Sequence, residues 1–196
     1  MKKLLFLFFC CCFSSLLFAQ SATDNQLNER LNTYMKLNRD QKFSELMNYL
    51  HPSIFSLVPK EKLAEVFEQS FDNDEIRISI DSTGITGISP VFKHQNSSYH
   101  YITYYMEMAL HLKDSSAMEN EEQIEFMNTS LKEGFPDGSV NYNKEKKAFL
   151  INGSNIMLAI KDAINPQWMF LGVEKKNPAM LRKLVPAAVI NHFKIL

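Results

Sequence analysis

The chain has 196 residues, of which 45% are hydrophobic, and its 21 basic and 22 acidic residues leave a formal net charge of -1. A chain of this length can bury a sizeable core and is expected to form one domain. The balanced charge excludes a strongly basic surface for nucleic acid. Gly-rich phosphate loops and zinc-protease motifs are also absent from the sequence.

The N-terminal segment has the pattern of a secretory signal peptide. A short basic start precedes an apolar run from Leu4 to Phe18, and small or polar residues follow at 19–22. The run is shorter than the roughly 20 apolar residues that span a bilayer, so we expect cleavage rather than a retained anchor. We therefore predict a signal peptide over 1–20 and a single α+β domain over 21–196. The mature chain is expected to be secreted or periplasmic, without a transmembrane segment.

All three cysteines, Cys10, Cys11 and Cys12, lie in this apolar run. The mature protein then has no cysteine, which excludes disulfides, thiol catalysis and cysteine-bound metal. No two of the five histidines have a metal-binding helix spacing. We therefore predict no metal site and no cofactor.

Three amphipathic helices are predicted before the first long strand. The first follows a cap at Asp24, the second follows Asp40 and ends before Pro52, and the third has Pro59 in its first turn. Residues 53–58 fit a short edge strand between the second and third helices. The apolar helix faces consist of Leu27, Leu31, Tyr34 and Met35, then Phe43, Leu46, Met47 and Leu50, then Leu63, Val66, Phe67 and Phe71.

Alternating strands follow these helices. Residues 76–80 alternate apolar and polar side chains, and Gly84 and Gly87 then punctuate the pattern. Residues 98–113 keep a period of two for longer than any other segment, and such a strand spans roughly 50 Å at about 3.3 Å per residue. Its even-numbered residues form a continuous apolar face, whereas its odd-numbered face is mixed.

In the second half of the chain, the residue pattern predicts a helix, two hairpins and a helical tail. The helix covers 119–132 and has acidic residues in its early turns, where they suit the positive end of the helix dipole. The tail begins at Asn177 and fits two short amphipathic helices. The predicted hairpin strands are 139–142 with 148–151, and 156–161 with 167–174.

Four segments carry a resemblance to a known family: Tyr49-Leu50-His51-Pro52, Pro59 to Phe71, Tyr99 to Leu112, and Trp168-Met169-Phe170. In this order, over residues 24 to 175, they resemble the nuclear transport factor 2-like superfamily. The resemblance implies a cone-like α+β fold, in which a curved antiparallel sheet packs on N-terminal amphipathic helices around an apolar cavity. Some members use the cavity for isomerase, dehydratase or epoxide-hydrolase chemistry, and others use it for binding. The inserted helix and the helical C-terminal tail depart from the family pattern.

The even face of the long strand borders the cavity that this resemblance implies. Methionine and aromatic side chains there would suit a small apolar ligand. The alternative is that these side chains simply fill a core. The predicted ligand-binding residues are Tyr104, Met106, Met108, Trp168 and Phe170.

The odd face of the same strand carries Tyr99, Tyr101 and Tyr105. Tyrosine combines a large apolar area with a hydroxyl that tolerates water, so these three residues predict a surface for an envelope protein or for a second copy in a homodimer. The alternative is that the tail after Asn177 covers them.

No catalytic set of the resembled enzymes is matched residue by residue in this sequence. We therefore predict an exported, non-catalytic binding or accessory protein that holds a small apolar ligand or docks a protein partner. One alternative is an isomerase- or dehydratase-like enzyme that uses a tyrosine with a carboxylate such as Asp81 or Glu107 in an apolar cavity. Another makes the tail a docking helix for an envelope assembly.

Overall fold

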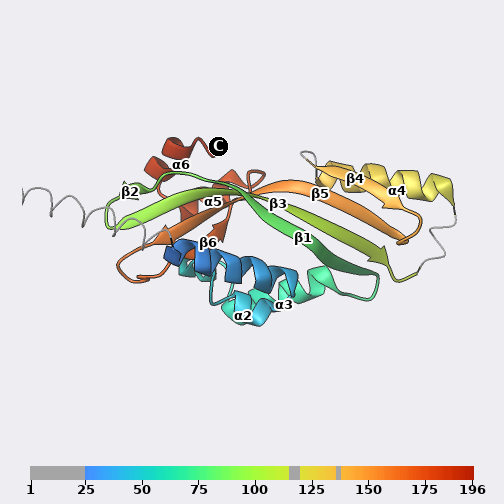
Figure 1. Ribbon diagram of the computed structural model, residues 1–196, viewed down its shortest axis with the longest axis horizontal. Coiled ribbons are helices and arrows are strands. Elements are labelled where there is room, and N and C mark those ends of the chain that lie inside the picture. The colour runs from blue at the N-terminus through green and yellow to red at the C-terminus, as the bar shows by residue number, and fades with distance from the viewer. Residues whose placement is uncertain (1–24, 115–119, 136–137) are drawn as a thin grey trace, which may run out of the picture.

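The computed structural model describes residues 25–114, 120–135 and 138–196. The predicted signal peptide over 1–20 and the predicted cap at Asp24 lie outside them. The described chain is α+β, as predicted, with helices packed on a curved, open antiparallel sheet of six strands (Figure 1). Within these residues, no helix has the length and hydropathy needed to cross a bilayer.

The sheet has the strand order β1-β3-β5-β4, with β2 also paired to β3 and β6 also paired to β5. The strands are β1 (Ile76–Ile88), β2 (Phe92–His94), β3 (Ser97–Leu112), β4 (Ser139–Asn143), β5 (Ala148–Lys161) and β6 (Met169–Gly172). The helices are one over 25–39, α2 (Phe43–Leu46), the 3-10 helix η1 (Pro52–Ser56), α3 (Lys60–Phe71), α4 (Glu121–Gly134), α5 (Pro178–Leu184) and α6 (Ala187–Phe193).

The predicted long strand is β3, and it forms the centre of the sheet together with β5. The two strands pair without a register shift from Ser98 opposite Lys161 to Leu110 opposite Phe149. Side chains therefore alternate cleanly between two faces along β3. We call these the even face and the odd face, after the numbering of β3.

The strand β1 continues through the two glycines that were expected to punctuate it. Its pairing with β3 shifts register between Ile80 and Ser82, and again between Ile85 and Gly87. Each shift inserts one extra residue, which bends an edge strand without ending it. Bulges therefore explain why the alternation breaks in the sequence although the strand continues.

The strand β5 joins two segments that were predicted as separate strands, 148–151 and 156–161. The polar residues 152–155 between them pair with β3 from Glu107 to Tyr104. The polarity that suggests a break in the sequence reflects a part of the sheet whose odd face is not covered by any helix of the described residues.

The second predicted helix is much shorter than expected, since α2 ends at Leu46. Residues 49–51 instead lie beside β6. The Phe170 N–H donates to the Tyr49 carbonyl at 2.7 Å, and the His51 N–H donates to the Phe170 carbonyl at 2.8 Å. The chain therefore leaves the helix early and adds a short stretch to the sheet.

The predicted edge strand over 53–58 is wrong, because this segment forms the 3-10 helix η1. Pro52 occupies the first turn, where its missing N–H costs no hydrogen bond. The His51 side chain caps the helix by accepting from the Ser53 N–H. The capping residue His51 followed by Pro52 therefore favours the start of a helix here rather than a strand.

The N-terminal helices cover the even face at the end of the sheet that contains β6 and form the first core. Ile102 on β3 and Met157 on β5 are fully buried against residues of the helix over 25–39, α2 and α3. This burial confirms the predicted apolar faces of Leu31 and Phe43, which are 2% and 3% exposed.

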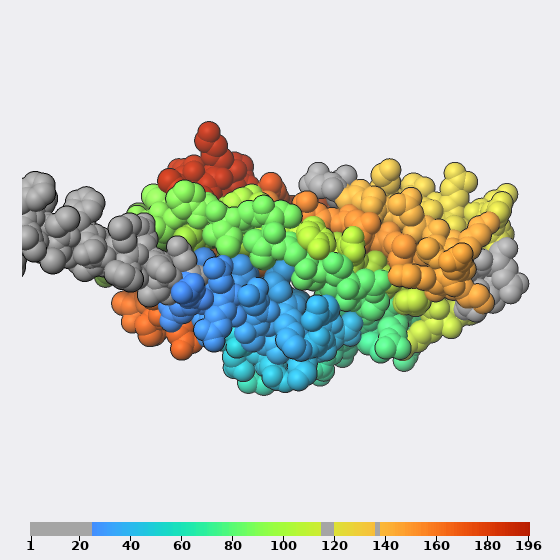
Figure 2. All heavy atoms as spheres, in the orientation of Figure 1, coloured from blue at the N-terminus to red at the C-terminus, as the bar shows by residue number. Residues whose placement is uncertain are grey.

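The helix α4 covers the same even face at the other end and forms the second core. Its residues Ile124, Met127 and Leu131 pack on Leu110 of β3 and Phe149 of β5. The sheet twists between its ends, so α4 and the N-terminal helices lie on opposite sides of the molecule in Figure 1. The long strands make the molecule elongated (Figure 2).

The C-terminal tail covers one end of the odd face and forms the third core. Leu181 of α5, Val185 after it and Val189 of α6 pack against Tyr99 of β3 and Leu158 of β5. This confirms the two short amphipathic helices predicted after Asn177. Within residues 25–114, 120–135 and 138–196, no helix covers the rest of the odd face.

Candidate functional site

The uncovered part of the odd face lies at the middle of β1, β3 and β5. On β3 it contains Tyr105, which lies opposite Gly84 and Ser154, and two residues further Glu107 opposite Ser82 and Asn152. We call this surface the open face. Its residues are Ser82, Gly84, Thr103, Tyr105, Glu107, Asn152 and Ser154. Of these, the side chains of Tyr105, Glu107, Asn152 and Ser154 are exposed.

Tyr105 is the aromatic residue of the open face, and its ring is held in place by β1. The ring lies across Gly84, and its hydroxyl is 3.2 Å from the Ser82 Oγ. A Cβ at 84 would lie too close to the Tyr105 Cε1, so a larger residue there requires the ring to shift. The Tyr105 side chain nevertheless remains 38% exposed, so a positioned aromatic ring is presented to solvent.

Gly84→Ala is expected to lower the free energy of unfolding by about 0.5–1.5 kcal/mol, because the new methyl group must displace the exposed Tyr105 ring from its position. In a Tyr105→Ala background the same change should cost much less. Urea denaturation of the four proteins measures this coupling. Gly153→Ala is the matched control, since no atom lies within 4 Å of a Cβ there. Equal costs of Gly84→Ala in both backgrounds would contradict the contact.

Both ends of the open face are closed. At one end, Tyr101 packs on Phe193 of the tail, with ring centroids 5.8 Å apart. At the other end, the Lys146 Nζ in the β4–β5 turn lies 3.3 Å from the Asp81 Oδ2 on β1. Ala109, on the odd face beyond the open face, is only 2% exposed. The exposed surface is therefore a bounded patch rather than a continuous sheet face.

The five predicted ligand-binding residues do not form one group. Trp168 and Phe170 are completely buried in the first core, and Tyr104 packs against that core. Met108 belongs to the second core, and Met106 lies half-buried between the two. Burial raises the pKa of Tyr104 far above its ordinary value, with a smaller contribution from nearby Tyr34. These side chains pack as core residues.

The three predicted partner-binding tyrosines are separated by the tail. Tyr99 is 5% exposed in the third core, and Tyr101 packs against the same core. The tail therefore covers Tyr99 and Tyr101, as the alternative interpretation of the sequence expected. Tyr105 is the member of the trio that remains exposed.

The carboxylates named for an isomerase-like site lie away from Tyr104. Asp81 and Glu107 are both exposed, and Asp81 is paired with Lys146. Glu107 belongs to the open face, whereas Tyr104 points to the opposite side of the sheet. No tyrosine–carboxylate pair is formed by these residues in a buried environment.

The fold brings together a serine, a histidine and an aspartate that the sequence did not connect. The His51 Nδ1 is 2.8 Å from the Ser53 Oγ, and its Nε2 is 3.2 Å from the Asp162 Oδ2. Burial opposes the charge of Asp162, but hydrogen bonds from the Asn165 backbone, His51 and the Asn165 side chain outweigh it and lower the Asp162 pKa. The arrangement has the connectivity of a nucleophile, a base and an orienting carboxylate.

The local geometry nevertheless gives this trio a structural role. The His51 Nδ1 also accepts the Ser53 N–H at 3.3 Å, so its lone pair is shared with the cap of η1. A base needs that lone pair free to take a proton from the serine. His51 thus caps η1 and fastens it, through Asp162, to the connection between β5 and β6. In the sequence, the only indication of this cap is the order His51-Pro52-Ser53.

Asp162→Asn is expected to lower the free energy of unfolding by about 1 kcal/mol at pH 7, because a partly buried, charge-assisted hydrogen bond is weakened. Since folding lowers the Asp162 pKa, its contribution is present above the unfolded pKa and is lost as pH falls below about 4. The wild type and the variant should therefore converge in acid. Urea denaturation at several pH values measures this, and Asp81→Asn is the control for an exposed ion pair. A difference independent of pH would contradict the assignment.

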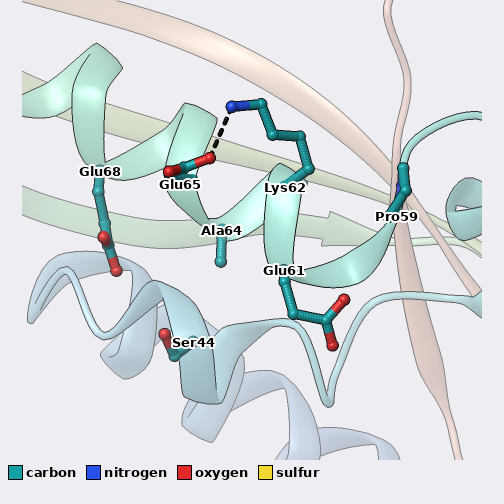
Figure 3. Close-up of a pocket in the computed structure, with 7 residues that line it drawn as sticks. All are labelled: Ser44, Pro59, Glu61, Lys62, Ala64, Glu65 and Glu68. Atoms are coloured by element: carbon teal, nitrogen blue, oxygen red, sulfur yellow. Dashed lines mark hydrogen bonds and ion pairs between the residues drawn. The ribbon is translucent and has the colours of Figure 1, made fainter.

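A hollow also lies between α2 and α3, lined by Ser44, Pro59, Glu61, Lys62, Ala64, Glu65 and Glu68 (Figure 3). The Lys62 Nζ bonds to the Glu65 Oε2 at 2.6 Å, which neutralises part of its acidic wall. Among the described residues, no group of three or more His, Cys, Asp or Glu side chains is arranged to hold a metal ion. The hollow is wide open to solvent and carries no chemistry of its own.

Comparison with known proteins gives no assignment: no protein-family model matches the chain, and no curated protein matches its sequence significantly.

Proposed function

We propose that this protein is an exported, non-catalytic binding or accessory domain that engages its ligand or partner through the open face. The observation that carries this proposal is the placement of Tyr105. Helices cover the even face at both ends and the tail covers one end of the odd face, yet this aromatic side chain is positioned by Gly84 and Ser82 and left exposed.

The contents of the two faces support binding over catalysis. The even face holds packed side chains, and its titratable groups Tyr104 and His100 are part of that packing, with the His100 Nδ1 2.8 Å from the Ser89 carbonyl oxygen. The carboxylates Asp81 and Glu107 lie on the other side. A general acid or base in an apolar cavity needs a titratable group inside that cavity. The side chains of the open face fill no core, so their polar groups and the Tyr105 ring are available to contact another molecule.

Site-specific photo-crosslinking in the exporting cells tests this proposal. The photoreactive residue p-benzoylphenylalanine is placed at Ser154 on the open face, and at exposed Glu125 on α4 as the control. The proposal predicts a discrete adduct from position 154 and none from position 125. Equal adducts from both positions, or none from position 154, would overturn it.

A further inference from the structure

We infer that the open face takes a neutral, hydroxyl-rich ligand, which makes an oligosaccharide its ligand class. This inference rests on the proposed binding function and narrows it. Three properties of the surface lead to it: its charge, its hydrogen-bonding groups and its exposed aromatic ring.

The charge of the open face disfavours anions and cationic polymers alike. Glu107 is the one charged residue of the open face, and the neighbouring Asp81 and Lys146 side chains neutralise each other at 3.3 Å. A phosphate or an acidic peptide would meet the Glu107 carboxylate without a compensating cation, and like charges that approach each other destabilise a complex. One carboxylate is also too little for a polycation. The complementary ligand is therefore uncharged.

The polar groups of the open face are those that pair with sugar hydroxyls. Ser82, Thr103 and Ser154 carry hydroxyls, and Asn152 carries an amide, so each of the four both donates and accepts hydrogen bonds. The Glu107 carboxylate accepts only, and can receive hydrogen bonds from two adjacent hydroxyls of one sugar ring. Ser82 already shares a hydrogen bond with the Tyr105 hydroxyl, and the Thr103 Oγ1 already accepts one from the Thr86 Oγ1 at 3.0 Å. A ligand dense in hydroxyls therefore pairs chiefly with Glu107, Asn152 and Ser154.

The Tyr105 ring supplies the apolar contact that such a ligand needs. One face of a pyranose ring presents C–H bonds, which carry partial positive charge and pack against the electron-rich face of an aromatic ring. Tyr105 lies across Gly84 with its hydroxyl 3.2 Å from the Ser82 Oγ, and it is 38% exposed, so the ring is oriented by β1 while one side of it faces solvent. Preorganisation of this kind lowers the entropic cost of binding.

A protein partner fits the same surface less well. The cores of protein interfaces are enriched in aromatic residues, methionine and arginine and depleted in serine. The open face instead has two serines and a threonine around one aromatic residue. Tyr105 is the one large hydrophobic side chain on it that is exposed in the described structure. A hydroxyl-rich surface with a single stacking residue therefore fits a hydroxyl-rich ligand better than a protein partner.

Isothermal titration of the purified mature chain with maltohexaose, cellohexaose and chitohexaose tests the inference. At least one of the three is expected to bind, with a Kd on the order of 0.1–1 mM. Tyr105→Ala should weaken that binding at least about tenfold through lost stacking, whereas Tyr105→Phe should retain most of it. Glu107→Gln should weaken it without disturbing the fold. Phe126→Ala is the matched control, because Phe126 is an exposed aromatic residue on α4.

The outcomes separate the inference from the function on which it rests. No binding of any of the three sugars at about 10 mM, or binding that Tyr105→Ala leaves unchanged, overturns the oligosaccharide assignment. If position 154 then crosslinks to a protein, or to a second copy of the chain, the binding function stands with a different occupant. If the sugars fail and position 154 gives no adduct, both proposals fail.

Discussion

Removal of residues 177–196 is expected to leave a chain that no longer folds. The tail packs on Tyr99, Leu158, Ile160 and Leu171, each at most 5% exposed in the third core. Fully burying one large apolar side chain contributes about 1.5–3 kcal/mol. Exposure of four such residues costs about 6–12 kcal/mol, which is comparable with the roughly 5–15 kcal/mol that a domain has in total.

Near-ultraviolet circular dichroism and thermal melting measure this loss. A chain that does not fold has no measurable free energy of unfolding, so Leu181→Ala is the variant in which the contribution of the tail can be measured. Leu181 is 2% exposed, and its truncation should cost about 2–5 kcal/mol. Lys183→Ala is the control on the exposed side of α5. A truncated protein that keeps a cooperative melting transition and loses only a partner would make the tail a docking helix instead.

Phe170→Ala is expected to lower the free energy of unfolding by about 3–5 kcal/mol, because it empties a fully buried aromatic site. Phe170 lies with its ring centroid 4.8 Å from that of Tyr34, inside the first core. If Phe170 instead lined an open ligand cavity, Phe170→Ala would only enlarge that cavity and would lower the free energy of unfolding by less. Urea denaturation distinguishes the two cases.

Met106→Ala is the comparison for this prediction. Met106 was also predicted to bind ligand, but it is only half-buried and belongs to none of the three cores. Its truncation should cost less than about 1.5 kcal/mol, since less apolar surface is lost. Similar small costs at both positions would show that Phe170 does not fill the core, contrary to this account.

Patterns confined to one segment predicted the elements well. The alternation over 98–113 identified β3, the stripe from Leu63 to Phe71 identified α3, and Pro178 marked the first turn of the tail. Each depends on contacts within a few residues, where periodicity and proline geometry decide the outcome. The signal peptide, the superfamily and the cell compartment remain predictions, which the described residues do not test.

Contacts between distant segments were not predictable in the same way. The Arg30 Nε donates to the Trp168 carbonyl at 2.5 Å, and His51 meets Asp162 across 111 positions of sequence. Nothing in the local pattern of either segment indicates its partner. The placement of Tyr105 over Gly84 likewise follows from the bulge that sets the register between β1 and β3. The open face therefore emerged only from the assembled sheet.

If the open face is the binding surface, a bound ligand or partner shields Tyr105 from solvent, and hydroxyl-radical footprinting of Tyr105 detects this shielding. The folded protein is oxidised with and without a soluble extract of the compartment to which it is exported. Phe126 on α4, 71% exposed, serves as the internal reference within the same molecule. We expect the extract to slow oxidation of Tyr105 and to leave the oxidation rate of Phe126 unchanged. An unchanged rate at Tyr105, or protection of Phe126 alone, would contradict it.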